Sequence, residues 1–317
     1  MKRIVILAGA LALLATPAAA EDSLKLAIGQ INNWENQAPT LGQDAGFFKK
    51  HGLVLENYGT AGAGETVQAV ISGSADIGAG VGVAGVMRAY QKGAPVRIIA
   101  PAFTGTSDLY WYVKADSPIK SLKDTTEKNT IAYSTNGSSS NNIVVAFVEE
   151  LGAKAKPTST GGPPATLTSV MSGQIDIGWA APPFGLQEIQ DGKIRIIARG
   201  SDVPSLRGQT VRVLIANANA LKARKDAIVR FMQGYREAVD WMYASPDAVQ
   251  MFAKKTGVAE NLVRDSMNQF QPKETMQTDQ MADLDGAIRD AVKLKFLDAP
   301  LTKEQLADFI QIPPRAK

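Results

Sequence analysis

Short loops rich in glycine, serine, threonine and asparagine recur along the chain where predicted strands end. Glycine lets backbone amides approach a bound molecule, and hydroxyl and amide side chains add hydrogen-bond donors without a net charge. The segment 136–142 combines a turn, three serines and an asparagine at a predicted helix start. This pattern suits a carboxylate, a sulfonate or a similar oxyanion held at the positive end of a helix. It indicates ligand binding, although serine and asparagine can also simply cap a helix.

Two tryptophans also follow predicted strand ends. Trp34 and Trp179 could cover a small ligand from opposite sides, and packing under a loop is an equal alternative for both. The loops contain no arginine or lysine, so we expect an anion to be held mainly by neutral donors and helix dipoles. Glu35, Glu65 and Asp108 lie nearby and could instead receive an amine, which leaves the ligand's charge open. The predicted ligand-binding residues are Asn33, Trp34, Thr60, Gly62, Gly82, Asn136, Gly137, Ser138, Ser139, Trp179 and Pro182.

Other chemistry is poorly supported by the sequence. The chain has no cysteine and a single histidine, His51, so we expect no metal site, no cofactor and no cysteine or serine catalytic centre. The segment Gly80 to Gly85 matches the G-x-G-x-x-G pattern of dinucleotide-binding folds, but it follows the third predicted strand, and no acidic residue closes the next one. The formal charge of +3 is spread along the chain and predicts no nucleic-acid partner.

The elements that position these loops come from an internal repeat. The segment Val70 to Gly78 reappears as Val170 to Gly178, at an offset of 100 positions. Similar pairs lie on both sides, 47–52 with 147–152 and 97–100 with 195–198. A unit of roughly 90 residues therefore occurs twice, which is too long for a solenoid repeat and predicts two similar lobes.

Each unit alternates strands and helices, which predicts a mainly parallel sheet flanked by helices. In the first unit the predicted strands are 24–28, 53–58, 75–79 and 96–100, and the predicted helices are 38–50, 65–72 and 83–92. Two further strands, 109–114 and 210–216, are predicted to cross between the lobes as a hinge. From 221 onward a helical pattern is predicted to pack on the first lobe. Loops at strand C-termini then face one shared cleft.

The N-terminal twenty residues have the features of an export signal: two basic residues, an apolar run and a small-residue cleavage site before Glu21. We predict that residues 1–20 are removed. Lobe 1 would then contain residues 21–112 and 213–317, and lobe 2 residues 113–212. Without cysteine the chain cannot carry a lipid on an N-terminal cysteine, so the expected compartment is the periplasm of a Gram-negative cell.

The sequence resembles the periplasmic substrate-binding proteins of ABC importers of the nitrate, sulfonate and taurine type, which are related to thiamine-precursor binders. The resemblance covers about residues 24–220 and is carried by the segments 46–53, 73–78, 113–114 with 122–124, and 136–139. It implies an α/β type II periplasmic-binding-protein fold, with Rossmann-like lobes joined by crossing hinge strands. It also implies a ligand between the lobes and an ABC permease complex as partner. By position, the family's contacts fall on the loops containing Trp34, Thr60, Gly82, Ser138 and Trp179.

The predicted function is that of a monomeric solute-binding receptor, and not an enzyme. It would capture a small organic anion, a sulfonate or an aromatic or other carboxylate, and deliver it to the permease. The alternative ligand is a pyrimidine, a thiamine precursor or another neutral heterocycle. A signalling receptor and an enzyme on the same fold are less favoured. A pyrimidine-forming synthase would be expected to carry a histidine and a cysteine-rich segment, and the chain has no cysteine.

Overall fold

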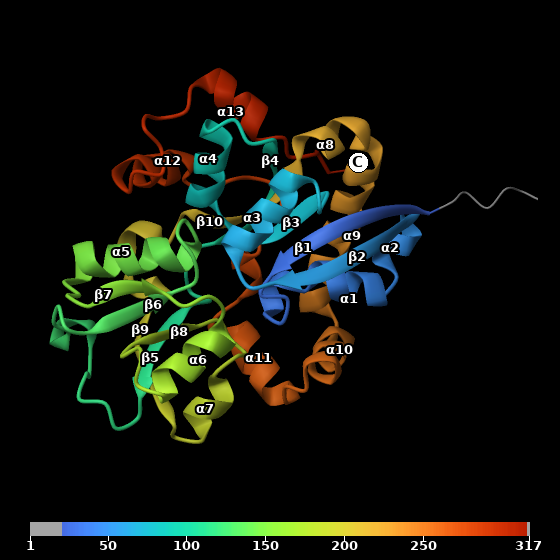
Figure 1. Cartoon of the computed structure of the whole chain (residues 1–317). Helices are drawn as coiled ribbons and strands as arrows, with labels where there is room; N and C mark the ends of the chain where they lie inside the picture. The colour runs from blue at the N-terminus through green and yellow to red at the C-terminus, as the bar shows by residue number, and fades with distance from the viewer. Residues whose placement is uncertain (1–20, 316–317) are drawn as a thin grey trace, which may run out of the picture.

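Residues 21–315 of the computed structural model form two α/β lobes, each built on one twisted sheet (Figure 1). The predicted export segment, residues 1–20, lies outside these described residues. In lobe 1 the strand order is β2-β1-β3-β10-β4, with β1 parallel to both of its neighbours and β10 antiparallel to both of its own. The bounds are β1 Asp22–Gly29, β2 Leu53–Thr60, β3 Ile77–Gly82, β4 Val96–Thr104 and β10 Thr210–Asn217.

The sheet of lobe 2 repeats this order. Strands β6 and β7 are parallel, and a parallel bridge between Ile131 and Ile177 joins β6 to the segment that leads into β8. Strand β5 lies antiparallel between β8 and β9, which gives the order β7-β6-β8-β5-β9. The bounds are β5 Tyr110–Lys114, β6 Thr130–Tyr133, β7 Lys156–Ser159, β8 Gly178–Ala180 and β9 Ile194–Arg199. The matching order confirms the two-lobed α/β fold predicted from the repeat.

The chain crosses between the lobes on two strands that are equivalent by topology. Strand β5 follows β4 of lobe 1 but pairs with β8 and β9 of lobe 2. Strand β10 follows β9 of lobe 2 but pairs with β3 and β4 of lobe 1. Each sheet therefore receives one antiparallel strand from the other half of the chain. All eight residues of β10 are buried, as a central strand requires.

Helices cover both sheets and largely follow the sequence pattern. Lobe 1 has α3 Ala63–Ser72 and α4 Val83–Gln91, and lobe 2 has α5 Ser139–Leu151, α6 Pro163–Met171 and α7 Leu186–Gln190. The helix predicted over 38–50 is wrong as a single element. It forms α1 Ala38–Asp44 and α2 Phe47–Lys50, because Gly46 adopts a left-handed conformation with φ +85° that ends the first helix.

The C-terminal third is helical and packs mainly on lobe 1. The long helix α9 Lys225–Ala244 contacts α1, α2 and β2, and its apolar face joins the lobe 1 core, where Phe231 stacks on Phe48 with ring centroids 5.5 Å apart. The other helices are α8 Ala218–Ala223, α10 Pro246–Thr256, α11 Glu260–Gln269, α12 Leu284–Lys293 and α13 Lys303–Phe309. None of the helices within residues 21–315 has the length and apolar character needed to span a membrane.

One segment of this C-terminal third departs from the expected packing. Phe270, just after α11, belongs to the hydrophobic core of lobe 2, where its ring lies 5.8 Å from that of Tyr110 and under the guanidinium of Arg199. The next residue, Gln271, donates a hydrogen bond to the carbonyl oxygen of Pro182 in lobe 2 at 2.9 Å. The chain after α11 is thus a third connection between the lobes, beside β5 and β10.

Candidate ligand-binding site

The loops that follow the strands of the two lobes face each other and enclose a small polar cavity. Its volume is about 20 Å³, close to the space that one water molecule needs. Loops of both lobes therefore meet at this cavity. The lining residues come from both lobes and from the crossing strand β10, and they are Gln30, Glu35, Asn36, Ala63, Gly80, Leu109, Ser134, Ser138, Ser139, Ser140, Trp179 and Arg212.

The N-terminus of α5 supplies the hydroxyl-rich side of the cavity. Ser138 caps the helix, since its Oγ accepts a hydrogen bond from the Asn141 amide at 3.1 Å. The Ser140 hydroxyl accepts from the Ser134 amide at 3.0 Å, which holds the preceding loop against the helix start. The first turn of a helix has amides without intrahelical acceptors, and its dipole is positive at this end. This part of the cavity is therefore suited to negative charge.

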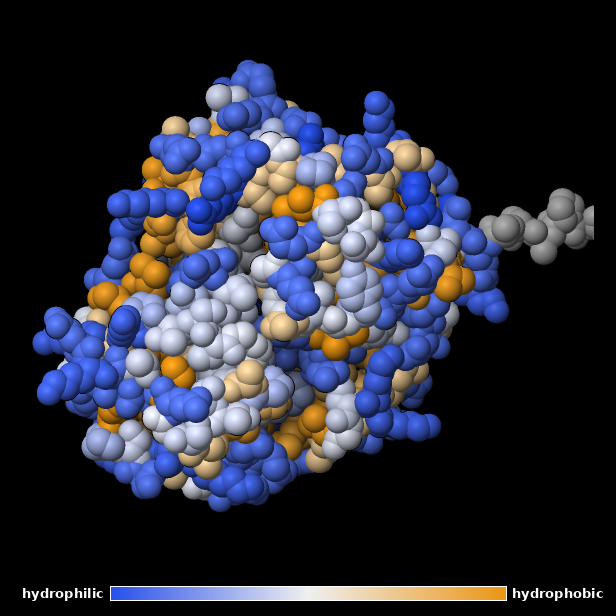
Figure 2. All heavy atoms as spheres, viewed as in Figure 1, coloured by the Kyte–Doolittle hydropathy of each residue, from blue (hydrophilic) through white to orange (hydrophobic). Residues whose placement is uncertain are grey.

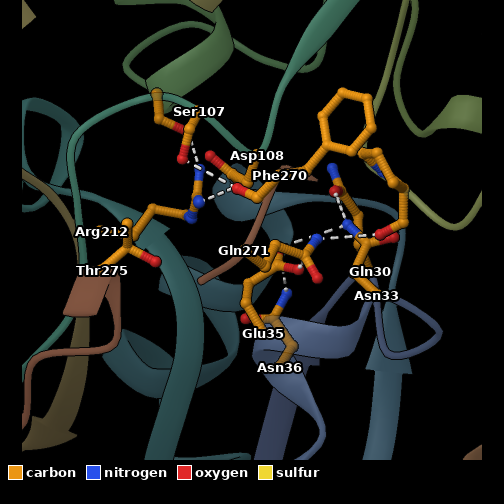
Figure 3. A network of polar contacts seen from close by, with 12 residues as sticks. Gln30, Asn33, Glu35, Asn36, Ser107, Asp108, Arg212, Phe270, Gln271 and Thr275 are labelled. Carbon is orange, nitrogen blue, oxygen red and sulfur yellow. Dashed lines mark hydrogen bonds and ion pairs between the residues drawn. The ribbon is translucent and has the colours of Figure 1, made fainter. Parts of the chain in front are cut away.

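An ion pair forms the charged centre of the cavity (Figure 3). Arg212 on β10 is 5% exposed, and it pairs with the fully buried carboxylate of Asp108, just before β5. Its Nη1 also donates to the Ser139 hydroxyl at 2.9 Å, and its guanidinium lies 4.7 Å from the Phe103 ring centroid. Burial raises the pKa of Asp108, while the Arg212 charge opposes that shift. The two crossing segments thus place one cation in direct contact with the start of α5.

A second buried carboxylate, Glu35, lies on the lobe 1 side of the same centre (Figure 3). It belongs to the short 3-10 helix Trp34–Asn36, and the Gln271 side-chain amide donates to it at 3.1 Å. Burial raises the pKa of Glu35 from its ordinary 4.5 to about 7, and the charge on Asp108 adds to that shift. Near neutral pH, the site therefore holds one guanidinium and two buried carboxyl groups, of which Glu35 is close to its titration point.

Several buried polar atoms around the cavity have no hydrogen-bond partner within residues 21–315. They include Trp179 Nε1, Ser134 Oγ, Asp108 Oδ1 and Arg212 Nε. Buried polar groups are normally satisfied, because an unpaired one costs about 1–3 kcal/mol. Such atoms gathered around one enclosed space indicate a place where a polar guest can complete the hydrogen bonding. Both donors and acceptors are present.

Glycines form the contact between the lobes beside the cavity. The amide of Gly85 in α4 donates to the Gly137 carbonyl across the lobe boundary at 3.2 Å. A Cβ added to Gly82 would lie 2.6 Å from the same carbonyl oxygen, and one added to Gly62 would lie 2.6 Å from Ser134 Oγ. The G-x-G-x-x-G segment thus serves close approach of the two lobes. This geometry supports the expectation that the segment is not a dinucleotide-binding loop.

This contact predicts the effect of Gly82→Ala. Gly82 has φ −72°, which alanine adopts freely, so the change should leave the fold and the solute-free melting temperature almost unaltered. Its methyl group would press on Gly137 and hold the lobes apart, and the affinity for a bound solute should fall about tenfold, or about 1.4 kcal/mol. Titration calorimetry would measure the affinity. Gly208→Ala is the matched control, because an added Cβ there meets open space. Equal affinities for both variants would contradict the role assigned to Gly82.

The structure brings some of the predicted residues together and not others. Ser138, Ser139 and Trp179 line the cavity, and Gly62, Gly82 and Gly137 lie at the lobe contact. Asn33 is buried behind the cavity, where it donates to Gln30 at 2.8 Å. Four other predicted residues do not line the cavity. Trp34 packs edge-on against Phe252 in the lobe 1 core, and the Thr60 hydroxyl forms a hydrogen bond with the Thr66 hydroxyl. Asn136 is exposed, and the Pro182 carbonyl accepts a hydrogen bond from Gln271.

Sequence reasoning placed Glu35 and Asp108 near the site but missed Arg212. It considered only the loops, whereas Arg212 reaches the cavity from a crossing strand. A signal was present: Arg212 is the one charged residue in the apolar run 210–216. Gln271 carried no such signal, since it lies about 70 residues beyond the repeat, which ends near residue 198. Within the described part of the chain, no cluster of three potential metal-ligating side chains is present.

Comparison with solved structures shows which fold this is. The alkanesulfonate-binding protein SsuA from Xanthomonas axonopodis pv. citri, bound to MOPS, matches with a TM-score of 0.74 and 14% identity over 92% of this chain and 99% of that one. The aliphatic sulphonate-binding protein SsuA from Escherichia coli gives 0.70 and 15% over 93% and 94%. The nitrate-binding protein NrtA from Synechocystis PCC 6803 gives 0.68 and 14% over 90% and 84%. No curated protein sequence matches the chain.

The strand order and the crossing strands, together with these matches, define the periplasmic-binding-protein fold. The chain belongs to the NMT1/THI5-like family, whose model matches residues 36–249.

Proposed function

We propose that this protein is the solute-binding receptor of an ABC importer and that it captures a small organic anion, a sulfonate or a carboxylate, between its lobes. The observation that carries the proposal is the contact of Arg212 with the N-terminus of α5 where loops of both lobes meet. The space there is about that of one water molecule, so the lobes would separate to admit the solute. The family match and the sulfonate- and nitrate-binding proteins with the same fold support it. Lobe 1, residues 21–112 with 213–317, and lobe 2, residues 113–212, would close on the solute about β5 and β10.

The anionic group would bind between Arg212, the Ser139 hydroxyl and the amides of α5. Hydrogen bonds between a charged donor and a charged acceptor are about twice as strong as neutral ones, so these groups would fix the solute's orientation. Trp179 would add a flat surface and its free Nε1 donor. Contacts from the second lobe exist only after closure, and closure is therefore favoured when solute is bound. The solute would leave unchanged, because the receptor delivers it to a permease and performs no chemistry.

A second candidate is a neutral or amino-bearing heterocycle. Two buried carboxyl groups, Glu35 and Asp108, face the one buried cation of the cavity, Arg212. A ring nitrogen or an amino group could donate to Glu35, and Trp179 could lie against the ring. An anion without any donor group would instead meet these carboxylates at close range. The two candidates differ in which residue the solute needs most, Arg212 or Glu35.

A thermal-shift screen followed by calorimetry tests the proposal. Sulfonates, aromatic carboxylates, pyrimidines and nitrate are the panel, since a bound solute raises the melting temperature by mass action. For the best hit we expect Ser139→Ala to weaken binding about tenfold, through loss of one charge-assisted hydrogen-bond partner. Ser74→Ala, at an exposed turn, is the matched control. Unchanged affinity in the Ser139 variant, or chemical conversion of the solute, would overturn the assignment.

We further propose that the protein works as a monomer in the periplasm after removal of residues 1–20. Export would give a mature chain that begins at Glu21, which intact-mass measurement on the purified protein would show. Light scattering would give the mass of one chain in solution. A retained N-terminal segment or a stable dimer would contradict this part of the proposal.

A further inference from the structure

A second, larger hollow lies at the surface where the two lobes meet. Its volume is about 350 Å³, and its walls are helices α3 and α4 of lobe 1, the turn before α5 in lobe 2 and Phe296 after α12. In Figure 2 apolar residues show at the surface among hydrophilic ones in this region of the visible face. The floor is apolar and contains Ala63, Val67, Ile71, Ala89 and Ala94. We call this hollow the α3–α4 groove.

The groove is a composite of both lobes. Asn136 and Gly137 of lobe 2 form one edge, and Gly82 and Gly85 of lobe 1 form the adjoining wall. The hydrogen bond from the Gly85 amide to the Gly137 carbonyl joins these two sides directly. If the lobes separated, this bond would break and the edge would move away from the floor. The groove in this form therefore belongs to the closed conformation.

The rim of the groove carries two cations. Arg88 on α4 and Lys92, the residue directly after the helix, are exposed, lie about one helical turn apart, and make no ion pair within residues 21–315. The Arg88 guanidinium lies 5.9 Å from the centroid of the Phe296 ring, which holds it beside the groove. None of the described residues that line the groove is acidic. Its charge is thus complementary to a carboxylate, and its floor is complementary to an apolar side chain.

We propose that the α3–α4 groove docks an acidic segment of the importer's membrane subunit, with an apolar side chain on the floor and an Asp or Glu against Arg88 and Lys92. This inference rests on the proposed import function. Because both lobes build the groove, the membrane subunit would recognise closure, and hence solute loading, through this contact. A second solute molecule is a poorer occupant, since exposed cations alone hold a small ion weakly and the floor offers it no hydrogen bonds.

The test uses the permease and ATPase of the importer that the receptor is proposed to serve, reconstituted together in phosphatidylethanolamine and phosphatidylglycerol vesicles, with solute-saturated receptor added. We expect R88E/K92E to bind solute within twofold of the unchanged receptor, because neither residue lines the solute cavity. The receptor concentration for half-maximal ATPase stimulation should rise at least tenfold. The matched control is K222E/K225E, which reverses two exposed lysines on α8 and α9, far from lobe 2 (Figure 1).

A photo-cross-linking residue placed at Gln68, on the groove wall, identifies the docked segment. The cross-linked peptide should contain Asp or Glu, and replacing that residue with Lys should restore stimulation by R88E/K92E. Two results would overturn this inference alone. One is that R88E/K92E stimulates the ATPase as well as the unchanged receptor does. The other is that K222E/K225E loses as much ATPase stimulation as R88E/K92E. Failure of the unchanged, solute-saturated receptor to stimulate the importer overturns the proposed function, and the inference with it.

Discussion

Replacing Arg212 with glutamine is expected to lower the free energy of unfolding by about 3–5 kcal/mol, because it leaves the carboxylate of Asp108 buried without its cation. Binding of an anionic solute should be lost as well, since Arg212 is the one charged donor among the described residues that line the proposed solute cavity. Urea unfolding, with the linear dependence on denaturant, measures the first effect, and titration calorimetry measures the second.

The double variant D108N/R212Q separates the two roles of Arg212. Removing both charges leaves no unpaired buried ion, so we expect most of the lost stability to return while anion binding stays absent. A double variant that still binds an anion with the original affinity would show that the ion pair is structural only. A double variant as unstable as R212Q would show that the cost comes from packing against Phe103 and not from the charge.

Glu35 is expected to give the protein an unusual pH dependence. Its pKa in the folded chain is about 7, above the ordinary 4.5, so the folded state binds the proton more tightly than the unfolded state. The contribution of Glu35 to stability is therefore fully present below about pH 4.5 and is lost as the pH rises to about 7. At about 1.4 kcal/mol per pKa unit, this interval corresponds to a loss of roughly 3 kcal/mol.

Glu35→Gln isolates this effect from the other titrating groups. As the pH rises from 4.5 to 8, the unchanged protein should lose roughly 3 kcal/mol of unfolding free energy that E35Q does not lose. Urea unfolding at pH intervals of one unit measures it, with saturating solute so that the lobes stay closed and Glu35 stays buried. Glu237→Gln is the control. Burial raises the pKa of Glu237, but hydrogen bonds from Lys50 and His51 outweigh it and lower that pKa below the ordinary 4.5, so the contribution of Glu237 stays nearly constant over this pH interval. Parallel stability curves for E35Q and the unchanged protein would contradict the pKa assigned to Glu35.

The two-lobed fold could be predicted because the chain repeats itself. The segment Val70 to Gly78 recurs as Val170 to Gly178, and this repeat predicted two similar sheets. The apolar runs near 110 and 210 predicted the two crossing strands. The loop before α5 was found by its residue types and its place at a strand end, and Ser138 and Ser139 do line the cavity. These features depend on local pattern and on topology, which a sequence displays directly.

The rest of the site depends on contacts that no local pattern displays. Trp34 and Trp179 occupy similar places after strand ends, yet only Trp179 lines the cavity. Trp34 lies in a 3-10 helix, and its ring is enclosed in the core by Tyr243 and Phe252. These two aromatic residues belong to C-terminal helices, which lie outside the repeat. Arg212 is directed to the cavity by the pairing of β10 with β3 and β4, a long-range register that its own strand does not specify.

If the two lobes open and close as proposed, the segment after α11 restricts that movement. The Gln271 amide donates both to Glu35 in lobe 1 and to the Pro182 carbonyl in lobe 2, so it cannot keep both acceptors when the lobes separate. With Phe270 anchored beside Tyr110, the segment would travel with lobe 2 and release Glu35. Opening would then expose that carboxyl to water, and its proton affinity would fall. Solute capture near neutral pH would accordingly be accompanied by proton uptake, which calorimetry in buffers of different ionisation enthalpy would reveal.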